Sequence, residues 1–156
     1  MKYTIVGCIT KYGIDDIRPY VESIKQSGFK GEKLMLVYDV SGEVISYLME
    51  NDWLIAQGQL QEHIILQRFR DMYALLHSSK TDVIIWTDVK DVIFQYNPSD
   101  WLNRNMGDYK FVAASESLKY CDEDWAVHNM NESYGNEIYQ WISNNIIYNA
   151  GSVAGE

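Results

Sequence analysis

Two aspartates, Asp88 and Asp91, follow directly after the apolar run VIIW at residues 83–86. Four consecutive bulky apolar residues, rich in β-branched side chains, predict a strand that is buried on both faces. A carboxylate beside such a strand is costly to bury unless it is paired, hydrogen-bonded or bound to a cation. In open α/β sheets, ligands bind just outside the carboxyl ends of the strands. The two aspartates therefore stand where Mg²⁺ or Mn²⁺ could be held between protein oxygens and phosphate groups.

The same two aspartates also fit a plain surface turn. Aspartate often ends strands because it starts turns and caps helices, and Lys90 between the two acids could neutralise them. On an extended chain, residues i and i+2 share a face, whereas residues i and i+3 do not. Both carboxylates can therefore reach one ion only if the chain turns after Asp88. The spacing by itself leaves the metal site and the surface turn both open.

Length and composition favour one globular domain. The chain has 156 residues, of which 47% are hydrophobic and 13% aromatic. A chain of this length buries roughly two-thirds of its unfolded surface. The net charge of −9 argues against nucleic acid and anionic membrane surfaces as partners, because both attract clustered Lys and Arg. An acidic protein that handles phosphates needs a metal ion or a few local cations.

The two cysteines, Cys8 and Cys121, have neither the spacing of a metal site nor that of a disulfide framework. Both lie in or near apolar runs, and we expect them to be buried free thiols. No signal peptide is visible after Met1, and no apolar run reaches the length of a membrane span. We therefore expect a protein of the reducing cytoplasm with no transmembrane segment.

Apolar segments alternate between strand and helix patterns along the first half of the chain. Strands are expected at residues 3–10, 33–38, 53–56 and 83–87, and helices at residues 14–27, 43–50 and 62–77. In the longest helix, Ile65, Phe69, Met72, Leu75 and Leu76 should share one buried face. Pro19 suits only the first turn of a helix, so a start as late as Arg18 stays open beside the start at residue 14. The alternation predicts an α/β fold: three α/β/α layers around a mostly parallel sheet.

The second half of the chain has weaker patterns. We expect a short helix from Pro98, a strand at 110–115, an irregular segment at 120–131, a helix at 131–141 and a last apolar run at 146–148. Ile138 and Trp141 should pack inward from the second of these helices. Gly151 and Gly155 are expected to form a tight turn near the end.

The block TDVKDVIFQYNP at residues 87–98 and the later NAG at 149–151 resemble the nucleotide-diphospho-sugar glycosyltransferases of the GT-A fold. In the similar families the block reads T-D-x-R-D-V-x-F-Q-x-x-P, and Lys90 stands here in place of the arginine. The resemblance covers nearly the whole chain from Ile5 to Gly155. The common D-x-D of this fold is one residue shorter than the spacing from Asp88 to Asp91.

This resemblance implies a metal-dependent glycosyltransferase that uses Mn²⁺ or Mg²⁺ and moves a sugar from a UDP- or GDP-sugar donor to an acceptor. It implies that residues 1–156 are a single GT-A-like nucleotide-sugar-binding domain. The C-terminal part of such enzymes usually adds a further metal ligand and much of the acceptor site. We expect that part to be missing, so that the domain is truncated at its C-terminus.

The resemblance also implies roles for the matched residues. Asp88 and Asp91 would hold the metal, and Asp88 would touch the nucleotide as well. Five further residues would contact the nucleotide: Thr10, Lys11, Tyr12, Asp39 and Arg68. Three residues near the end would line the substrate side: Asn149, Ala150 and Gly151. Glu116 ends a predicted strand, where it could bind sugar hydroxyls or merely cap a turn.

Other functions stay open beside the glycosyltransferase. One is a non-catalytic, truncated GT-A-like domain that binds a nucleotide sugar or a protein partner. The chain contains neither G-x-x-x-x-G-K-[ST] nor G-x-G-x-x-G, which argues against nucleotide sites of those kinds. A phosphotransferase with an aspartate nucleophile is disfavoured, because its D-x-D-x-[TV] spacing does not match the segment from Asp88 to Asp91.

Overall fold

The computed structural model describes residues 1–77 and 80–156, which alternate between strands and helices as expected. In chain order the elements are β1 (Tyr3–Thr10), α1 (Ile14–Gln26), β2 (Glu32–Tyr38), α2 (Gly42–Glu50), β3 (Leu54–Gln57), α3 (Ile64–Leu76), β4 (Val83–Thr87), α4 (Pro98–Asn105), β5 (Phe111–Lys119), η1 (Tyr120–Asp122), α5 (Asp124–Ile142) and β6 (Ile146–Gly155). The first four strands lie within one residue of their predicted bounds, because continuous apolar runs define them well.

The strands form one mixed sheet in the order β3-β2-β1-β4-β6-β5. Strand β1 pairs in parallel with β2 and β4, and β2 pairs in parallel with β3, whereas β6 runs antiparallel to β4. Helix α1 connects β1 to β2, α2 connects β2 to β3, and α3 leads from β3 to β4, as crossover connections between parallel strands require. The predicted three-layer α/β/α fold with a mostly parallel sheet is confirmed.

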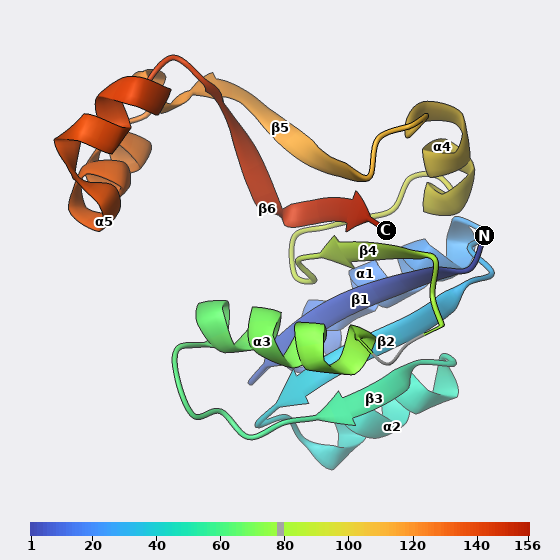
Figure 1. The fold of residues 1–156 in the computed structure, drawn as a ribbon. Helices are drawn as coiled ribbons and strands as arrows, with labels where there is room; N and C mark the ends of the chain where they lie inside the picture. Colours follow the sequence, from blue (N-terminus) through green and yellow to red (C-terminus); the bar gives the residue numbers. More distant parts are fainter. Residues whose placement is uncertain (78–79) are drawn as a thin grey trace. The chain divides into compact units, whose positions relative to one another are not determined.

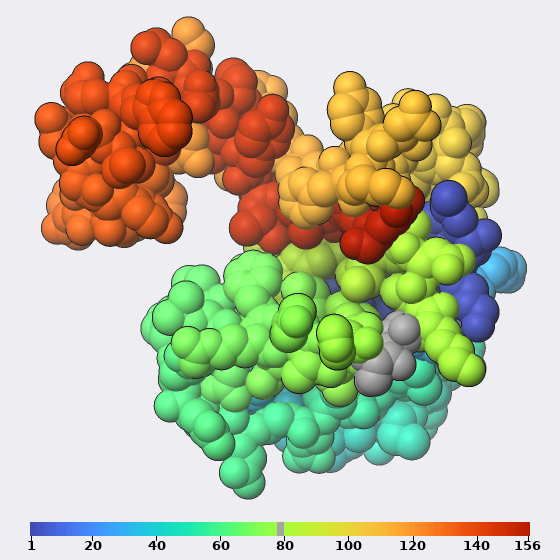
Figure 2. Space-filling model, in the orientation of Figure 1, coloured from blue at the N-terminus to red at the C-terminus, as the bar shows by residue number. Residues whose placement is uncertain are grey.

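Side chains that alternate along the strands pack against helices on both faces of the sheet. On one face, Ile5 and Ile9 of β1 join a core with side chains of α1, α2 and α4. On the other face, Val6 and Trp86 pack with side chains of α3. Figure 1 shows α3 in front of the sheet and α1 behind it. Figure 2 shows the same side, with the green segment that contains α3 at the surface.

The buried face of α3 differs in part from the predicted one. Ile64 packs against the sheet together with three of the predicted residues: Phe69, Met72 and Leu76. Ile65 and Leu75 were predicted to share this face, but they are 53% and 38% exposed. The apolar set is wider than the stripe that a single sheet can cover, so its flanking members face solvent.

Helix α1 begins at Ile14 with Gly13 as its N-cap, so the later start at Arg18 is wrong. Pro19 lies inside the second turn, on an exposed position. The carbonyl of Asp15, which lacks an N–H partner four residues later, also lies on the exposed side and is open to water. Gly28 follows the helix with a φ of 76°, as expected of a C-terminal stop.

The chain divides into two compact units, one of residues 1–112 with 151–156 and one of residues 113–150. In the second unit, η1 and α5 occupy the segment that was predicted to be irregular. The Glu123 carboxylate accepts a hydrogen bond of 2.6 Å from the Ala126 N–H, which caps a helix at that point. Ile138 and Trp141 were predicted to pack inward, but they are 40% and 82% exposed. A single domain over residues 1–156 stays a prediction.

Strand β6 passes through Gly151 and Gly155 without the predicted turn. Pairing with β4 keeps this segment extended, with Ser152 opposite Thr87. At Gly155 an added Cβ would lie 3.0 Å from the Lys110 carbonyl oxygen. This glycine therefore serves a close approach of two backbones and not a turn.

Both cysteines are free thiols, as predicted. Cys8 is half-buried in β1, but Cys121 is exposed, so its predicted burial is wrong. Cys121 lies in η1, none of whose residues is buried, and an apolar neighbourhood in sequence did not translate into a core position. Among the described helices, none is long and apolar enough to cross a membrane.

Candidate functional site

The predicted donor-binding residues gather where the parallel strands end. Thr10 is the last residue of β1, Asp39 follows β2, and Asp88 follows β4. Because these strands are parallel neighbours, their carboxyl ends meet at one edge of the sheet. Strand β6 reaches the same edge from the opposite direction, and the Gly151 carbonyl accepts a hydrogen bond of 2.7 Å from the Asp88 N–H.

A cleft of about 660 Å³ opens at this carboxyl edge. Five of the predicted residues line it: Thr10, Tyr12, Arg68, Asp88 and Asp91. The sequence analysis missed five others: Cys8, Ile64, Ile65, Val89 and Lys90. We call this cavity the carboxyl-edge cleft. Its walls come from β1, α3 and the loop after β4, which are distant in sequence.

The chain turns after Asp88, as a shared ion would require. Residues 89–91 form bends directly after β4, and Val89 between the two aspartates is only 3% exposed. An added Cβ at Gly7 of β1 would lie 2.8 Å from Val89 Cγ2. Gly7 therefore lets the loop settle onto the sheet, which positions both aspartates at the rim of the cleft.

Side chains of helix α1 form hydrogen bonds with both ends of the acidic loop, residues 87–94. The Tyr20 hydroxyl is hydrogen-bonded to Thr87 Oγ1 at 2.7 Å, and both side chains are buried. One turn further on, the Ser23 hydroxyl accepts a hydrogen bond of 3.1 Å from the Phe94 N–H. Residues three apart on a helix share a face, so one side of α1 holds both ends of the loop.

The surface-turn hypothesis supposes that Lys90 neutralises the two aspartates, but Lys90 pairs with a different residue. Its Nζ lies 3.1 Å from Asp16 Oδ1 on α1 and 5.5 Å from the centre of the Tyr12 ring. The hydrogen bond to Asp16 raises the pKa of Lys90, while the Gly13 N–H and then Lys90 lower the pKa of Asp16. In the described part of the chain, the Asp91 carboxylate has no ion-pair partner.

Arg68 of α3 pairs with Asp88. Its Nη1 donates a hydrogen bond of 2.7 Å to Asp88 Oδ1, and the two side chains are 18% and 40% exposed. The guanidinium carbon lies 5.0 Å from the centre of the Phe69 ring and 5.6 Å from that of Trp86. Arg68 Nε and Thr10 Oγ1 are buried with no hydrogen-bond partner among the described residues. Such unpaired groups are costly, and a polar ligand in the cleft would satisfy them.

Cys8 lies in the same cleft, and burial raises the pKa of its thiol to about 12. The alternation of β1 could have revealed it, because Cys8 lies two residues from Thr10 and so faces the same side of the sheet. No comparable signal marks Ile64 or Lys90, whose places in the cleft depend on tertiary packing.

Lys11 and Asp39 do not line the cleft, although each directly follows a strand of the carboxyl edge. Both have left-handed backbones, with φ values of 56° and 50°, which is uncommon for residues other than glycine. Their side chains form an exposed ion pair of 3.8 Å. A pair this exposed contributes little to stability.

The predicted substrate residues fall into different units. In the second unit, Asn149 Nδ2 donates a hydrogen bond of 3.2 Å to Glu116 Oε1, and Ala150 follows in the same strand. Gly151 belongs to the first unit, where it bonds to the Asp88 backbone. The structure thus brings Glu116 together with Asn149, and Gly151 together with Asp88.

The residues of the carboxyl-edge cleft fit a metal ion that is shared with phosphates. Within residues 1–77 and 80–156, no group of three or more His, Cys, Asp or Glu side chains could hold a metal. The two carboxylates of Asp88 and Asp91 are too few for a closed Zn²⁺ or Ca²⁺ site. They suit Mg²⁺ or Mn²⁺, which keep water ligands and accept phosphate oxygens.

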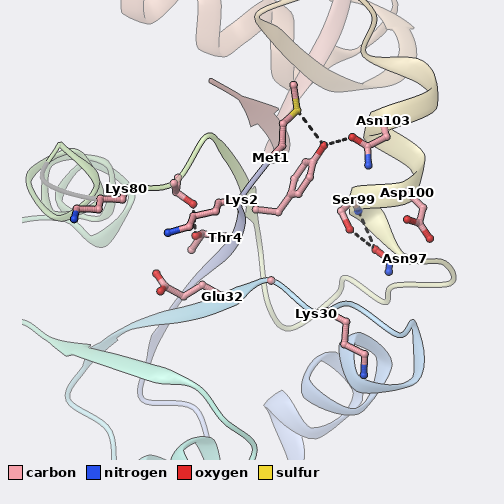
Figure 3. Close-up of a pocket in the computed structure, with 13 residues that line it drawn as sticks. Met1, Lys2, Thr4, Lys30, Glu32, Lys80, Asn97, Ser99, Asp100 and Asn103 are labelled. Atoms are coloured by element: carbon pink, nitrogen blue, oxygen red, sulfur yellow. Dashed lines mark hydrogen bonds between the residues drawn. The ribbon is translucent and has the colours of Figure 1, made fainter.

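A second hollow of about 610 Å³ lies at the opposite, amino edge of the strands (Figure 3). Several of its uncharged polar side chains bond to one another. The Tyr3 hydroxyl donates to Asn103 Oδ1 at 2.5 Å, and Asn97 Oδ1 accepts from the Ser99 hydroxyl at 2.6 Å. We call this cavity the amino-edge hollow. Unlike the cleft, its described lining residues include no buried side-chain nitrogen or oxygen without a hydrogen-bond partner.

No family model matches the sequence, and a comparison with curated proteins finds no match either. Solved structures do match. Glucosyl-3-phosphoglycerate synthase from Mycobacterium tuberculosis aligns with a TM-score of 0.67 at 10% identity, over 99% of this chain and 56% of that one. A mannosyltransferase from Pyrobaculum calidifontis, solved with GDP-Man and Mn²⁺, aligns with a TM-score of 0.59 at 11% identity, over 99% and 44% of the two chains.

The glycosyltransferase GlyE of Streptococcus pneumoniae aligns with a TM-score of 0.57 at 17% identity, over 99% of this chain and 34% of that one. The chain therefore spans between about a third and just over half of the length of these three structures. At such identities the likeness establishes the fold alone. The chain has the GT-A fold of the nucleotide-sugar glycosyltransferases.

Proposed function

We propose that the chain binds a UDP- or GDP-sugar in the carboxyl-edge cleft, with Asp88 and Asp91 holding Mn²⁺ or Mg²⁺, and transfers the sugar to an acceptor. The observation that carries this proposal is the make-up of the cleft. At the carboxyl edge of a GT-A sheet, it gathers two carboxylates, a guanidinium and a buried hydroxyl. Among the described residues, one of the carboxylates has no ion-pair partner and the hydroxyl has no hydrogen-bond partner.

The side chains of the cleft match the parts of such a donor. A bound metal would offset the negative charge that builds on the diphosphate as the sugar leaves. The Arg68 guanidinium has further N–H donors in a planar fork, which suits phosphate oxygens. The Thr10 hydroxyl and the Tyr12 ring offer a hydrogen bond and a flat apolar surface to the nucleoside. In this proposal Lys11 and Asp39 flank the nucleoside at the ends of β1 and β2.

We assign the sugar and acceptor side to Glu116, Asn149, Ala150 and Gly151. The carboxylate of Glu116 and the amide of Asn149 already bond to each other. A carboxylate next to an amide offers both acceptors and donors, the groups that sugar hydroxyls need. Glu116→Ala and Asn149→Ala should therefore weaken use of the sugar donor more than binding of the bare nucleoside diphosphate.

Calorimetric titration tests donor binding directly. UDP and GDP are each titrated into the protein with Mn²⁺ and again with EDTA. The proposal expects saturable binding of at least one nucleotide with Mn²⁺ and strongly reduced binding with EDTA. Absence of binding of both nucleotides in the presence of Mn²⁺ would contradict it.

A second function, donor binding without transfer, is favoured by the division of the chain. The first unit holds the metal and nucleotide residues together with Gly151, whereas Glu116 and Asn149 lie in the second. The first unit could thus bind a donor without any reaction. Release of nucleoside diphosphate from UDP- and GDP-sugars with Mn²⁺, followed over hours, separates the two functions. Release supports the enzyme, and binding without release supports the binding domain.

A further inference from the structure

The Asp88 carboxylate already has a cation beside it in the free protein. Arg68 Nη1 lies 2.7 Å from Asp88 Oδ1, and the Arg68 side chain is only 18% exposed. Hydrogen bonds between two charged groups are among the strong ones in proteins. The faces of Phe69 and Trp86 attract the guanidinium as well. A metal ion that takes this carboxylate must therefore compete with Arg68.

The other cations near the cleft are engaged elsewhere. Lys90 Nζ pairs with Asp16, and Lys11 pairs with Asp39. Asp91 has no ion-pair partner among the described residues. The two aspartates therefore differ, because Asp88 already has a cation at Oδ1 whereas Asp91 has none among the described residues. Arg68 is therefore the cation with which a metal ion would compete at Asp88.

We propose that Arg68 acts as a resident cation, which excludes the metal from Asp88 until a diphosphate draws the guanidinium away. The proposal rests on the metal site of the proposed function. Moving Arg68 off Asp88 without a new partner would leave a largely buried charge unpaired, which is costly. Phosphate oxygens remove that cost, and the buried Arg68 Nε, which has no hydrogen-bond partner in the described part of the chain, can donate to them. Metal and diphosphate should thus bind well together and the metal poorly alone.

The test measures binding of Mn²⁺ alone, by the electron paramagnetic resonance signal of the free ion. Arg68→Met keeps an apolar stem against Phe69 and Trp86 but removes the charge. We expect Arg68→Met to bind Mn²⁺ at least about tenfold tighter than the parent, as loss of a charge-assisted bond implies. Arg68→Lys keeps a cation and should stay close to the parent. Arg70→Met is the matched control, because Arg70 pairs with Glu62 on the exposed side of α3.

The coupling between metal and nucleotide gives a second readout. In the parent, UDP or GDP should raise the affinity for Mn²⁺, and in Arg68→Met this increase should shrink, because the metal no longer competes with a cation. A merely structural role for Arg68 would leave the affinity for Mn²⁺ alone unchanged. Thermal unfolding without metal checks that each variant is folded, and Arg68→Gln replaces Arg68→Met if the latter is not.

The outcomes separate this inference from the proposed function. Equal affinity of parent and Arg68→Met for Mn²⁺ alone overturns the inference, and so does absence of Mn²⁺ binding in both. Tighter Mn²⁺ binding in Arg68→Met, with no nucleotide bound by the parent, upholds the competition and removes the nucleotide-sugar function. Tighter binding together with a smaller nucleotide effect upholds both.

Discussion

The two edges of the same parallel sheet differ in whether their buried polar groups have hydrogen-bond partners. At the amino edge, the Tyr3 hydroxyl bonds to Asn103, and Thr4 is bonded to Thr81. At the carboxyl edge, Thr10 Oγ1 and Arg68 Nε are buried without a partner, as far as the described residues show. Both cavities are of similar size, so volume does not distinguish them. Their hydrogen bonding does.

Left-handed backbones occur at both edges, since Asp52, with a φ of 61°, lies just before β3 at the amino edge. Lys11 and Asp39 have positive φ values and directly follow β1 and β2 at the carboxyl edge. Strained backbones and unsatisfied groups lower stability and persist where other demands act on the chain. The difference in hydrogen bonding supports the proposal that the carboxyl edge binds a ligand, whereas the amino edge stabilises the fold. Substitutions at the two edges should therefore separate stability from binding.

Gly31→Ala at the amino edge should have the largest effect on stability. Its Cβ would lie 2.3 Å from the Tyr3 carbonyl oxygen and 2.3 Å from Phe29 Cζ. Because one of these atoms is backbone, we expect a loss of about 3 kcal/mol or more in the free energy of unfolding. Urea denaturation measures it, with Gly42→Ala as the control, since nothing lies within 4 Å of its added Cβ. An unchanged midpoint for Gly31→Ala would contradict the assigned role of this edge.

Gly7→Ala should cost less stability but should affect the binding site as well. Its Cβ would lie 2.8 Å from Val89 Cγ2, a side chain that can shift. We expect a loss of about 1–3 kcal/mol in the free energy of unfolding. Because Val89 lies between Asp88 and Asp91, Mn²⁺-dependent nucleotide affinity should also fall, as calorimetry would detect. A loss of stability with unchanged affinity would show that the position of the loop does not affect the binding site.

Tyr20→Phe tests the support that α1 gives to the acidic loop. The change removes the hydrogen bond to Thr87 Oγ1 and leaves that buried hydroxyl unpaired. We expect the free energy of unfolding to fall by about 1–2 kcal/mol. Tyr109→Phe is the matched control, because Tyr109 is 73% exposed. Equal losses in the two variants would show that the buried bond adds nothing.

Asp16→Asn should produce the smallest effect, a slight loss of stability near neutral pH that disappears in acid. The Gly13 N–H and then Lys90 hold the pKa of Asp16 below its ordinary value of 3.8. A depressed folded-state pKa gives stability that is fully present above the unfolded pKa and is lost as the pH falls through the folded pKa. Urea denaturation at pH 6 and below pH 4 should therefore show a smaller acid loss in Asp16→Asn. An acid loss equal to that of the parent would contradict the assignment.

The fold was predictable where the pattern along the chain is local. The run of four apolar residues predicted β4, and turn and helix signals placed its neighbours. Strand β6 was not predictable, because its extended form depends on pairing with β4 across more than sixty residues. The start of α1 was uncertain for a similar reason, since the exposed position of Pro19 on this helix became visible only in the folded chain.

The residues of the candidate site could be predicted from the sequence, but the ion pairs that they form could not. Asp88 and Asp91 do line one cleft with Arg68, as expected of a shared site. The pairs from Arg68 to Asp88 and from Lys90 to Asp16 join separate elements, and residue types alone do not determine such partners. These ion pairs determine which carboxylate has a cation beside it. The structure therefore revealed a difference between the two aspartates that the sequence did not show.

One measurement tests the central claim most directly, namely that Asp91 is a ligand of a metal shared with a nucleoside diphosphate. UDP and GDP are titrated calorimetrically with Mn²⁺ into the parent, Asp91→Asn and Asp100→Asn. Asp91→Asn removes one charge with almost no change of shape, and Asp100 lines the amino-edge hollow instead. The account predicts loss of Mn²⁺-dependent binding in Asp91→Asn and parental binding in Asp100→Asn. Parental binding in Asp91→Asn would contradict it and leave the two aspartates as a surface turn.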